Sequence, residues 1–204
     1  MAIRIEERFV VKAPVGPVWD YLVDPRRVVA CVPGGELEEV VDERTFHGKV
    51  SVKVGTLTLA YRGRVRLAEA DVGGRRVKIV GEARESAGTG SARLTLESWL
   101  TSLPGARTEV VVEARAEVGG RIARLGRGAI ELVGHQVFRQ FAARVRAGVE
   151  AEEAGRAAVA AGAPPAPARP PRQEPLRALP LIFRALGAWL AGLFRQRGGG
   201  ARRS

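Results

Sequence analysis

Residues 57–67 read LTLAYRGRVRL, a run in which apolar and polar side chains alternate without a break. Leu, Leu, Tyr, Gly, Val and Leu occupy the odd positions, and Thr, Ala and three arginines occupy the even ones. Because successive side chains of a strand point to opposite faces, the pattern predicts a strand with one buried and one solvated face. This is the fold-determining signal of the chain.

The same alternation continues on both sides of this run. It predicts six further strands, at residues 3–12, 36–41, 44–54, 77–83, 92–100 and 110–118. Short turn signals separate them, among them Asp42-Glu43, Gly73-Gly74 and Pro104-Gly105. Strands joined by short turns, each apolar on one side only, predict an antiparallel sheet.

A helical pattern follows the last strand and supplies a cover for the apolar face. Residues 121–153 repeat apolar side chains at helical spacing, and Gly119-Gly120 marks the junction. Two short helices are expected at residues 14–23 and 25–31, the second capped by Asp24. We therefore expect an α+β domain over residues 1–153, a helix-grip arrangement in which a curved antiparallel sheet of about seven strands wraps one long C-terminal helix.

This order of elements resembles the CoxG family of carbon monoxide dehydrogenase proteins, a branch of the START-like (SRPBCC) superfamily. The resemblance covers about residues 3–150, and its motifs gain weight from their order and spacing. One departure is Thr56, where the family pattern leads us to expect a proline. The matching residues are Ala13-Pro14, Val18-Trp19, Asp24-Pro25, Cys31-Val32-Pro33-Gly34, Val52-Lys53-Val54-Gly55, Tyr61-Arg62-Gly63, Ala87-Gly88 through Ala92, and Val118-Gly119-Gly120.

The resemblance implies a non-enzymatic accessory protein that holds a hydrophobic ligand, for which a respiratory quinone is the candidate. It also implies a molybdenum-containing hydroxylase of the carbon monoxide dehydrogenase type as partner, recruited to the cytoplasmic membrane so that its electrons reach the quinone pool. Two alternatives remain open: an assembly or maturation factor for that hydroxylase, and a small-molecule enzyme that uses the same interior.

The formal charge of +11 is unevenly distributed along the chain. Residues 1–155 carry 24 basic and 21 acidic side chains, whereas residues 156–204 carry nine arginines and only Glu174 as an acid. The first part is therefore near +3 and the last quarter near +8. A nearly balanced body argues against a nucleic-acid-binding face, so no nucleic acid is expected as a partner.

The last quarter divides into a linker, an amphipathic segment and a basic tail. Residues 154–175 are rich in proline and alanine, which predicts a semi-rigid linker. Residues 176–197 predict an interfacial helix with arginines opposite a broad apolar face, and residues 198–204 form the basic tail. The membrane-binding candidates are Leu179, Ile182, Phe183, Leu186, Trp189, Leu190, Leu193 and Phe194, with Arg177, Arg184 and Arg195.

These features predict a cytoplasmic protein, peripheral on the inner face of the cell membrane. The longest uncharged run in this segment, residues 185–194, is too short to span a bilayer. Docking of the amphipathic helix into a partner groove, or back onto the body, is the alternative. One cysteine, Cys31, excludes an intramolecular disulfide and fits a reducing compartment.

The predicted inner face carries the ligand candidates. Gly48, Gly63 and Gly81 remove side-chain volume there, so that either the helix approaches closely or a cavity opens. Glu7 and Ser98 are polar residues on this apolar face, explained by a strand irregularity or by a ligand that needs a polar partner. The predicted lining residues are Phe46, Leu59, Tyr61, Leu96, Leu132, Phe138 and Phe141.

Catalytic and metal-binding signals are weak. The histidines His47 and His135 lack metal-ligand spacing, so no metal and no obligatory cofactor are expected. Cys31 is expected to be a small buried residue and not a nucleophile. An enzyme would need convergent acid and base groups, for which Glu7, Tyr61 and His135 are the candidates.

Overall fold

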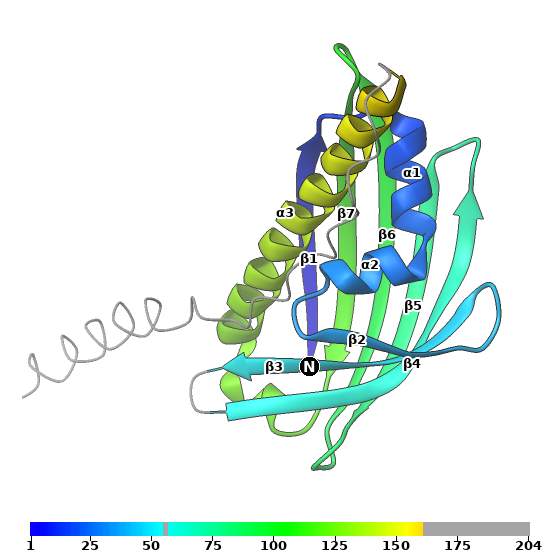
Figure 1. The fold of residues 1–204 in the computed structure, drawn as a ribbon. Coiled ribbons are helices and arrows are strands. Elements are labelled where there is room, and N and C mark those ends of the chain that lie inside the picture. Colours follow the sequence, from blue (N-terminus) through cyan, green and yellow to red (C-terminus); the bar gives the residue numbers. More distant parts are fainter. Residues whose placement is uncertain (55–56, 161–204) are drawn as a thin grey trace, which may run out of the picture.

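A computed structural model describes residues 1–54 and 57–160 of the chain. In these residues one antiparallel sheet faces a long C-terminal helix, with two short helices beside it (Figure 1). The elements are β1 (Ala2–Val11), α1 (Val15–Val23), α2 (Pro25–Cys31), β2 (Gly35–Val40), β3 (Thr45–Val54), β4 (Leu57–Asp71), β5 (Arg76–Glu85), β6 (Ser91–Leu103), β7 (Arg107–Val118), a 3₁₀ turn (Ile122–Leu125) and α3 (Arg127–Ala160).

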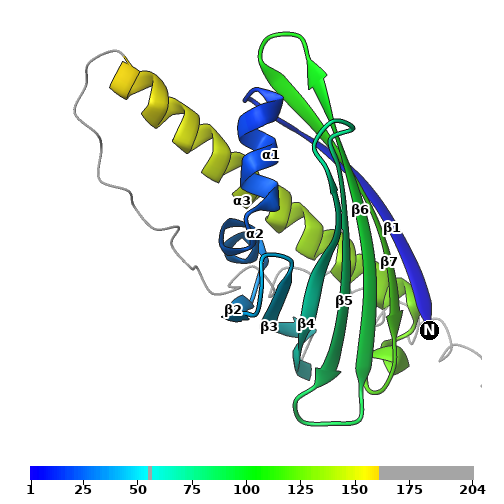
Figure 2. The ribbon, with the colours of Figure 1, turned by 90° about the vertical axis from the view of Figure 1, so that its right-hand side faces the viewer.

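The sheet confirms the predicted α+β class and its seven antiparallel strands. Their order is β1-β7-β6-β5-β4-β3-β2, so that β1 crosses to the far edge and pairs with β7. The rest is a meander of neighbouring hairpins, as the turn signals predicted. Seen from the side, the sheet curves around α3, α1 and α2 (Figure 2).

The core lies between the concave face and the three helices. Its main cluster joins Phe9 and Val11 of β1 to Val145 and Val149 of α3. Asp24 caps α2 by accepting hydrogen bonds from the Arg26 and Arg27 amides, as predicted. Burial of apolar side chains such as those of the main cluster stabilises the fold by about 1.5–3 kcal/mol each.

The long helix differs from the prediction at both ends. Gly126 has a φ of +83°, which separates a 3₁₀ turn from α3, so the helix proper begins at Arg127. At the other end it continues to Ala160, seven residues beyond Glu153. The first seven residues of the predicted 154–175 linker are therefore helical, because this alanine-rich stretch favours the helix. The rest of the linker, the 176–197 helix and the basic tail lie outside the described residues.

Two glycines of α3 allow the helix to pack closely. A Cβ on Gly134 would lie 2.2 Å from Ile5 Cδ1, and one on Gly148 would lie 2.2 Å from the Tyr21 hydroxyl oxygen. The helix therefore lies directly against β1 at one point and against α1 at the other. Within the described ranges, no helix is long and apolar enough to cross a membrane.

Candidate functional site: the concave face of the sheet

Part of the concave face is apolar and open to solvent. Val65 of β4, Gly81 of β5 and Leu94 of β6 lie side by side in the strand register. Val65 is 41% exposed and Leu94 is 37% exposed, because α3 packs mainly on β1 at the far edge of the sheet. We call this row, with Gly81 at its centre, the apolar trough.

Gly81 and Gly63 of this face are glycines for different structural reasons. A Cβ on Gly81 would meet its neighbours only at 3.8 Å or more, so this glycine leaves space in the trough. A Cβ on Gly63 would lie 2.1 Å from the Glu82 carbonyl oxygen, so this glycine is required by the close approach of β5. Neither glycine contacts α3, so the close helix approach that the sequence left open does not occur at these two positions.

Six of the seven predicted lining residues are buried or partly buried, in two groups. Leu96, Phe138 and Phe141 pack against the main core cluster, where the Phe138 ring lies 5.9 Å from that of Phe9. Phe46, Leu59 and Tyr61, from β3 and β4, are buried outside the two core clusters. The predicted residues therefore divide into a group packed on the main core, two of whose members lie on α3, and a group on β3 and β4, and they do not form one cluster.

Leu132 does not belong with them, which corrects that prediction. It is 48% exposed, whereas Ile130 is buried and Gly134 lies against Ile5. At about 100° per residue, Leu132 lies about 200° around α3 from both of these neighbours. The helical spacing is correct, but the predicted phase of the inward face is wrong at this position.

Glu7 and Ser98 both lie on the concave face in an uninterrupted register, so no strand irregularity explains them. Glu7 is paired with α3, since its carboxylate lies 2.6 Å from His135 Nδ1. Ser98 is 6% exposed and its hydroxyl has no hydrogen-bond partner among the described residues. A buried hydroxyl without a partner costs about 1–3 kcal/mol, which a ligand could recover.

Besides Glu7 and Ser98, the concave face carries a second pair of polar residues, Tyr61 and Glu85. They occupy directly opposed positions of β4 and β5. The Tyr61 hydroxyl and Glu85 Oε2 are both buried and have no partner in the described part of the chain. Burial raises the pKa of the Tyr61 hydroxyl, and the nearby Glu85 carboxylate raises it further. Tyr61 therefore stays protonated and able to donate a hydrogen bond at neutral pH.

The other oxygen of Glu85 is held by an ion pair. Glu85 Oε1 accepts hydrogen bonds from Nε and Nη2 of Arg121, and the Glu85 side chain is only 1% exposed. Gly88 and Gly90 leave room for the carboxylate, because a Cβ on either would lie within 2.7 Å of Oε2. The sequence predicts only a turn after β5, and nothing in it points to the packing of these glycines against a buried carboxylate.

The three acid–base candidates are not brought together. Glu7 and His135 are paired, but Tyr61 lies on β4, four strands away from β1 in the sheet order. Strands lie about 4.8 Å apart, so the separation is about 19 Å along the sheet. Among the described residues, no group of three or more His, Cys, Asp or Glu side chains could hold a metal ion.

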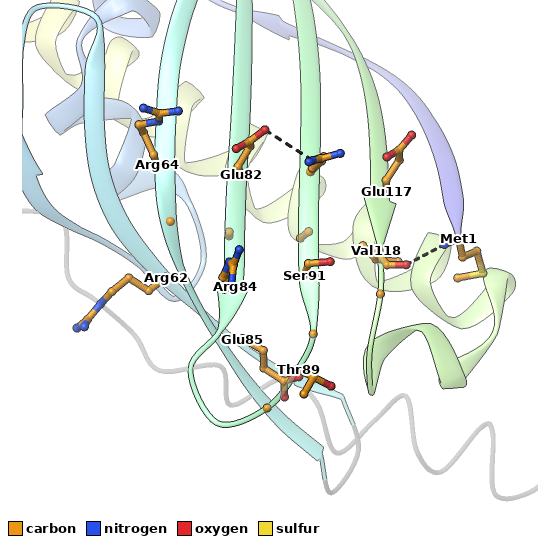
Figure 3. A pocket seen from close by; sticks show the side chains of 17 residues that line it. Met1, Arg62, Arg64, Glu82, Arg84, Glu85, Thr89, Ser91, Glu117 and Val118 are labelled. Atoms are coloured by element: carbon orange, nitrogen blue, oxygen red, sulfur yellow. Dashed lines mark hydrogen bonds and ion pairs between the residues drawn. The ribbon is translucent and has the colours of Figure 1, made fainter.

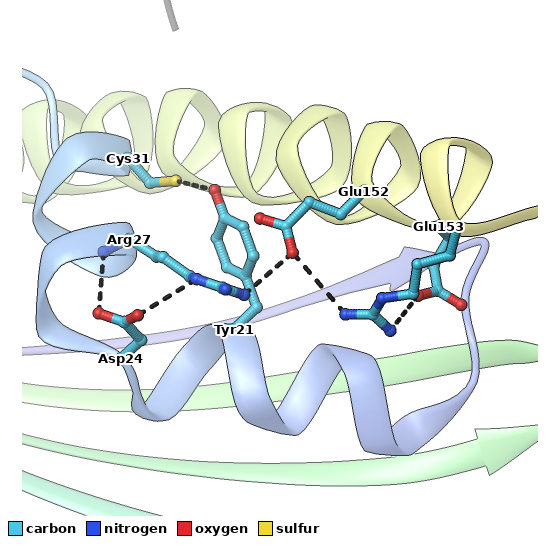
Figure 4. A network of polar contacts seen from close by, with 7 residues as sticks. Tyr21, Asp24, Arg27, Cys31, Glu152 and Glu153 are labelled. Atoms are coloured by element: carbon cyan, nitrogen blue, oxygen red, sulfur yellow. Dashed lines mark hydrogen bonds and ion pairs between the residues drawn. The ribbon is translucent and has the colours of Figure 1, made fainter. Parts of the chain in front are cut away.

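A polar network fastens the two short helices to α3 (Figure 4). Arg27 of α2 bonds Asp24 and Glu152, the latter at 2.9 Å, and stacks over the Tyr21 ring. The Tyr21 hydroxyl lies 3.5 Å from the sulfur of Cys31, which is buried, as the sequence predicted. Burial raises the pKa of both groups. The network fixes α1 and α2 beside the concave face.

A hollow of about 810 Å³ lies on the opposite, outer face, near the β5–β6 turn (Figure 3). Arg62, Arg64, Arg84 and Arg93 line it, with Glu82 and Glu117. None of the predicted ligand-lining residues borders it. Since its lining is charged, it is unsuited to a hydrophobic ligand, and the concave face remains the candidate site.

Comparison with known proteins gives the family. The CoxG family, named for a component of carbon monoxide dehydrogenase, matches residues 8–150, which span β1 to α3 and most of the described chain. The chain belongs to this family. The match confirms the family resemblance on which the sequence-based expectations depend. In a separate comparison, no curated protein matches the chain.

Solved structures show the START-like fold. A conserved protein from Geobacillus kaustophilus is 19% identical with a TM-score of 0.64, covering 72% of this chain and 95% of its own. The Zhui aromatase/cyclase from Streptomyces sp. R1128 is 18% identical with a TM-score of 0.56, covering 80% and 100%. A START superfamily protein from Mycobacterium smegmatis is 12% identical with a TM-score of 0.51, covering 72% and 97%. At these identities the likeness concerns the fold alone.

Proposed function

We propose that this member of the CoxG family is a non-catalytic accessory protein that holds a hydrophobic ligand against the concave face of its sheet. One observation carries the proposal: two buried polar atoms without partners among the described residues, on Tyr61 and Glu85, lie on the same face of β4 and β5 as the apolar trough. An apolar site with a few polar groups suits a mainly hydrophobic molecule that carries a few polar atoms.

A respiratory quinone fits this description, and the family supports it. Tyr61 is a hydrogen-bond donor that would hold one carbonyl oxygen, while Val65 and Leu94 of the apolar trough, on the same face of the sheet, would pack on the apolar parts. When bound, a quinone supplies two-electron redox chemistry. The protein's own residues bind it, orient it and shield it from water. The separation of Tyr61 from the Glu7–His135 pair favours holding over catalysis.

The second part of the proposal concerns location and partner. Family membership implies association with carbon monoxide dehydrogenase, a molybdenum hydroxylase. We propose that residues 176–197 bind the inner face of the cytoplasmic membrane as an amphipathic helix and bring the hydroxylase to the quinone pool. An assembly factor is the alternative; it would bind the immature hydroxylase in preference to the mature enzyme and would not need the membrane.

Ligand binding is tested by titrating menaquinone into the full chain and following quenching of tryptophan fluorescence. Tyr61→Phe should weaken binding by about fivefold to tenfold, because it removes one hydrogen bond, whereas Ser98→Ala, eight residues farther along the sheet, should change binding by less than about twofold. Tyr21→Phe is the matched control, since Tyr21 already bonds Cys31. Lack of saturable binding by the unaltered protein would refute the ligand proposal.

Membrane binding is tested by co-sedimentation with phosphatidylglycerol vesicles. The full chain should sediment with the vesicles, and a chain that lacks residues 176–204 should stay in the supernatant. Replacing Phe183 and Trp189 with Asp should have the same effect, because both lie on the predicted apolar face. Equal sedimentation of all three proteins would contradict the proposed anchor.

A further inference from the structure

The outer face of the sheet carries a concentration of arginine at β4 and β5. Arg62, Arg64 and Arg66 are consecutive outward residues of β4, and Arg84 of β5 lies directly opposite Arg62. Lys49 of β3 lies opposite Arg62 on its other side. Like charges at directly opposed positions destabilise a sheet, so this row is unfavourable in the isolated protein.

Local acids compensate only some of these charges. Lys49 pairs with Glu36 at 2.8 Å, Arg62 with Glu38 at 2.7 Å, and Arg93 with Glu82 at 3.6 Å. Arg64, Arg66 and Arg84 are exposed and have no ion pair in the described part of the chain. We call these three the arginine triad. Two of them, Arg64 and Arg84, line the outer hollow (Figure 3).

The charges around the triad indicate what kind of surface fits it. Glu82 stands between Arg64 and Arg93 in the register, and Glu117 follows Arg93 on β7. A uniformly anionic membrane would meet these carboxylates as well as the arginines, which is unfavourable. A protein surface can instead place acidic side chains opposite the arginines alone, and the guanidinium group binds carboxylates in a bidentate manner.

We propose that the arginine triad is the docking surface for an acidic patch of a partner protein. This inference rests on the proposed function, because that partner is the molybdenum hydroxylase that the family accompanies. The chain's own tail is an unsuitable occupant, since residues 156–204 carry nine arginines and one acid. Arginine suits such an interface because it is enriched in protein–protein contacts.

The test is a titration of the purified hydroxylase against the immobilised full chain at several salt concentrations. The double variant Arg64→Glu/Arg84→Glu reverses two triad charges. The control variant Arg127→Glu/Arg139→Glu reverses two exposed charges on α3, so both variants have the same net charge. We expect the triad variant to weaken binding by about tenfold or more and the α3 variant by less than about twofold. The triad variant should also bind with less salt dependence. Circular dichroism must show that both variants are folded.

The outcomes separate the two proposals. If the unaltered chain does not bind the hydroxylase, the proposed partner is wrong and the docking surface with it. If it binds and both variants bind equally, the docking surface is wrong while the proposed function stands. Two further measurements use the same variants. The first is binding to phosphatidylglycerol vesicles, and the second is self-association in sedimentation velocity. If the triad variant loses either of these while its hydroxylase binding is unchanged, the triad serves a membrane or a second copy of the chain. Either result would overturn the inference.

Discussion

Gly148 shows how strictly single positions are defined by packing. A Cβ there would lie 2.2 Å from the Tyr21 hydroxyl oxygen and 2.7 Å from Cζ, and Tyr21 is only 7% exposed. We expect Gly148→Ala to lower the free energy of unfolding by about 1–2 kcal/mol, because overpacking outweighs the better helix propensity of alanine. Urea denaturation measures the change.

Gly155 of the same helix provides the control. Nothing lies within 4 Å of a Cβ at this position, so only helix propensity changes in Gly155→Ala. That variant should be more stable than the unaltered protein by about 0.5–1 kcal/mol. Equal effects at both glycines would mean that α3 does not press against Tyr21.

The Tyr21–Cys31 pair predicts loss of stability at alkaline pH. Burial raises the pKa of both groups, so both remain protonated in the folded protein when the unfolded chain begins to lose its protons, near pH 8.5 for cysteine and 10 for tyrosine. Their contribution is therefore complete below about pH 8 and declines as the pH rises. Urea midpoints from pH 7 to 10 should fall, and should fall less in Tyr21→Phe/Cys31→Ala. Parallel profiles would contradict this account.

At the scale of the structural elements, the β5–β6 turn is held by one ion pair. It joins Glu85, at the end of β5, to Arg121, which directly precedes the 3₁₀ turn. Arg121→Met leaves the buried Glu85 carboxylate without its partner and should cost about 1–3 kcal/mol, a range lowered because Arg121 is 44% exposed. Arg121→Met/Glu85→Gln should recover part of this loss, since no buried charge remains. Arg124→Met, at an exposed residue of the adjacent turn, is the control, with an expected change below about 0.5 kcal/mol. Chemical denaturation compares the three variants.

The strands could be predicted from the sequence because alternation and turn residues are local signals. The end of α3 could not, because the alanine-rich residues 154–160 precede prolines and suit a helix or a linker equally well. Spacing alone assigns Leu132 to the inner face, whereas its true phase depends on which residues meet β1.

The polar parts of the candidate site were harder to predict. Glu85 and Arg121 are 36 residues apart, and their contact exists only because the β5–β6 turn meets the chain after β7. Glu7 stands out in the sequence as an anomaly on its face, but its partner His135 is 128 residues away. Such contacts depend on the tertiary arrangement, which a pattern along one strand does not contain.

For the whole molecule, the uneven charge predicts two separable behaviours. Binding of the full chain to anionic vesicles should weaken strongly from about 50 to about 500 mM salt, because nine arginines lie in residues 156–204. A chain ending at residue 160 should keep the melting temperature of the full chain within about 2 °C, since the sheet, the core and α3 are retained. A large loss of stability on truncation would mean that the tail packs on the body.

The length of α3 has a geometric consequence for any assembly in which this protein takes part. Its 34 residues make a rod of about 50 Å, which begins near the outer hollow and ends beside α1 (Figure 1). The described part of the chain therefore ends at Ala160, at the end of α3 remote from the outer hollow that Arg64 and Arg84 line. A partner held at the triad and a surface held by the tail would be kept apart by the body, which would act as a spacer of defined length between them.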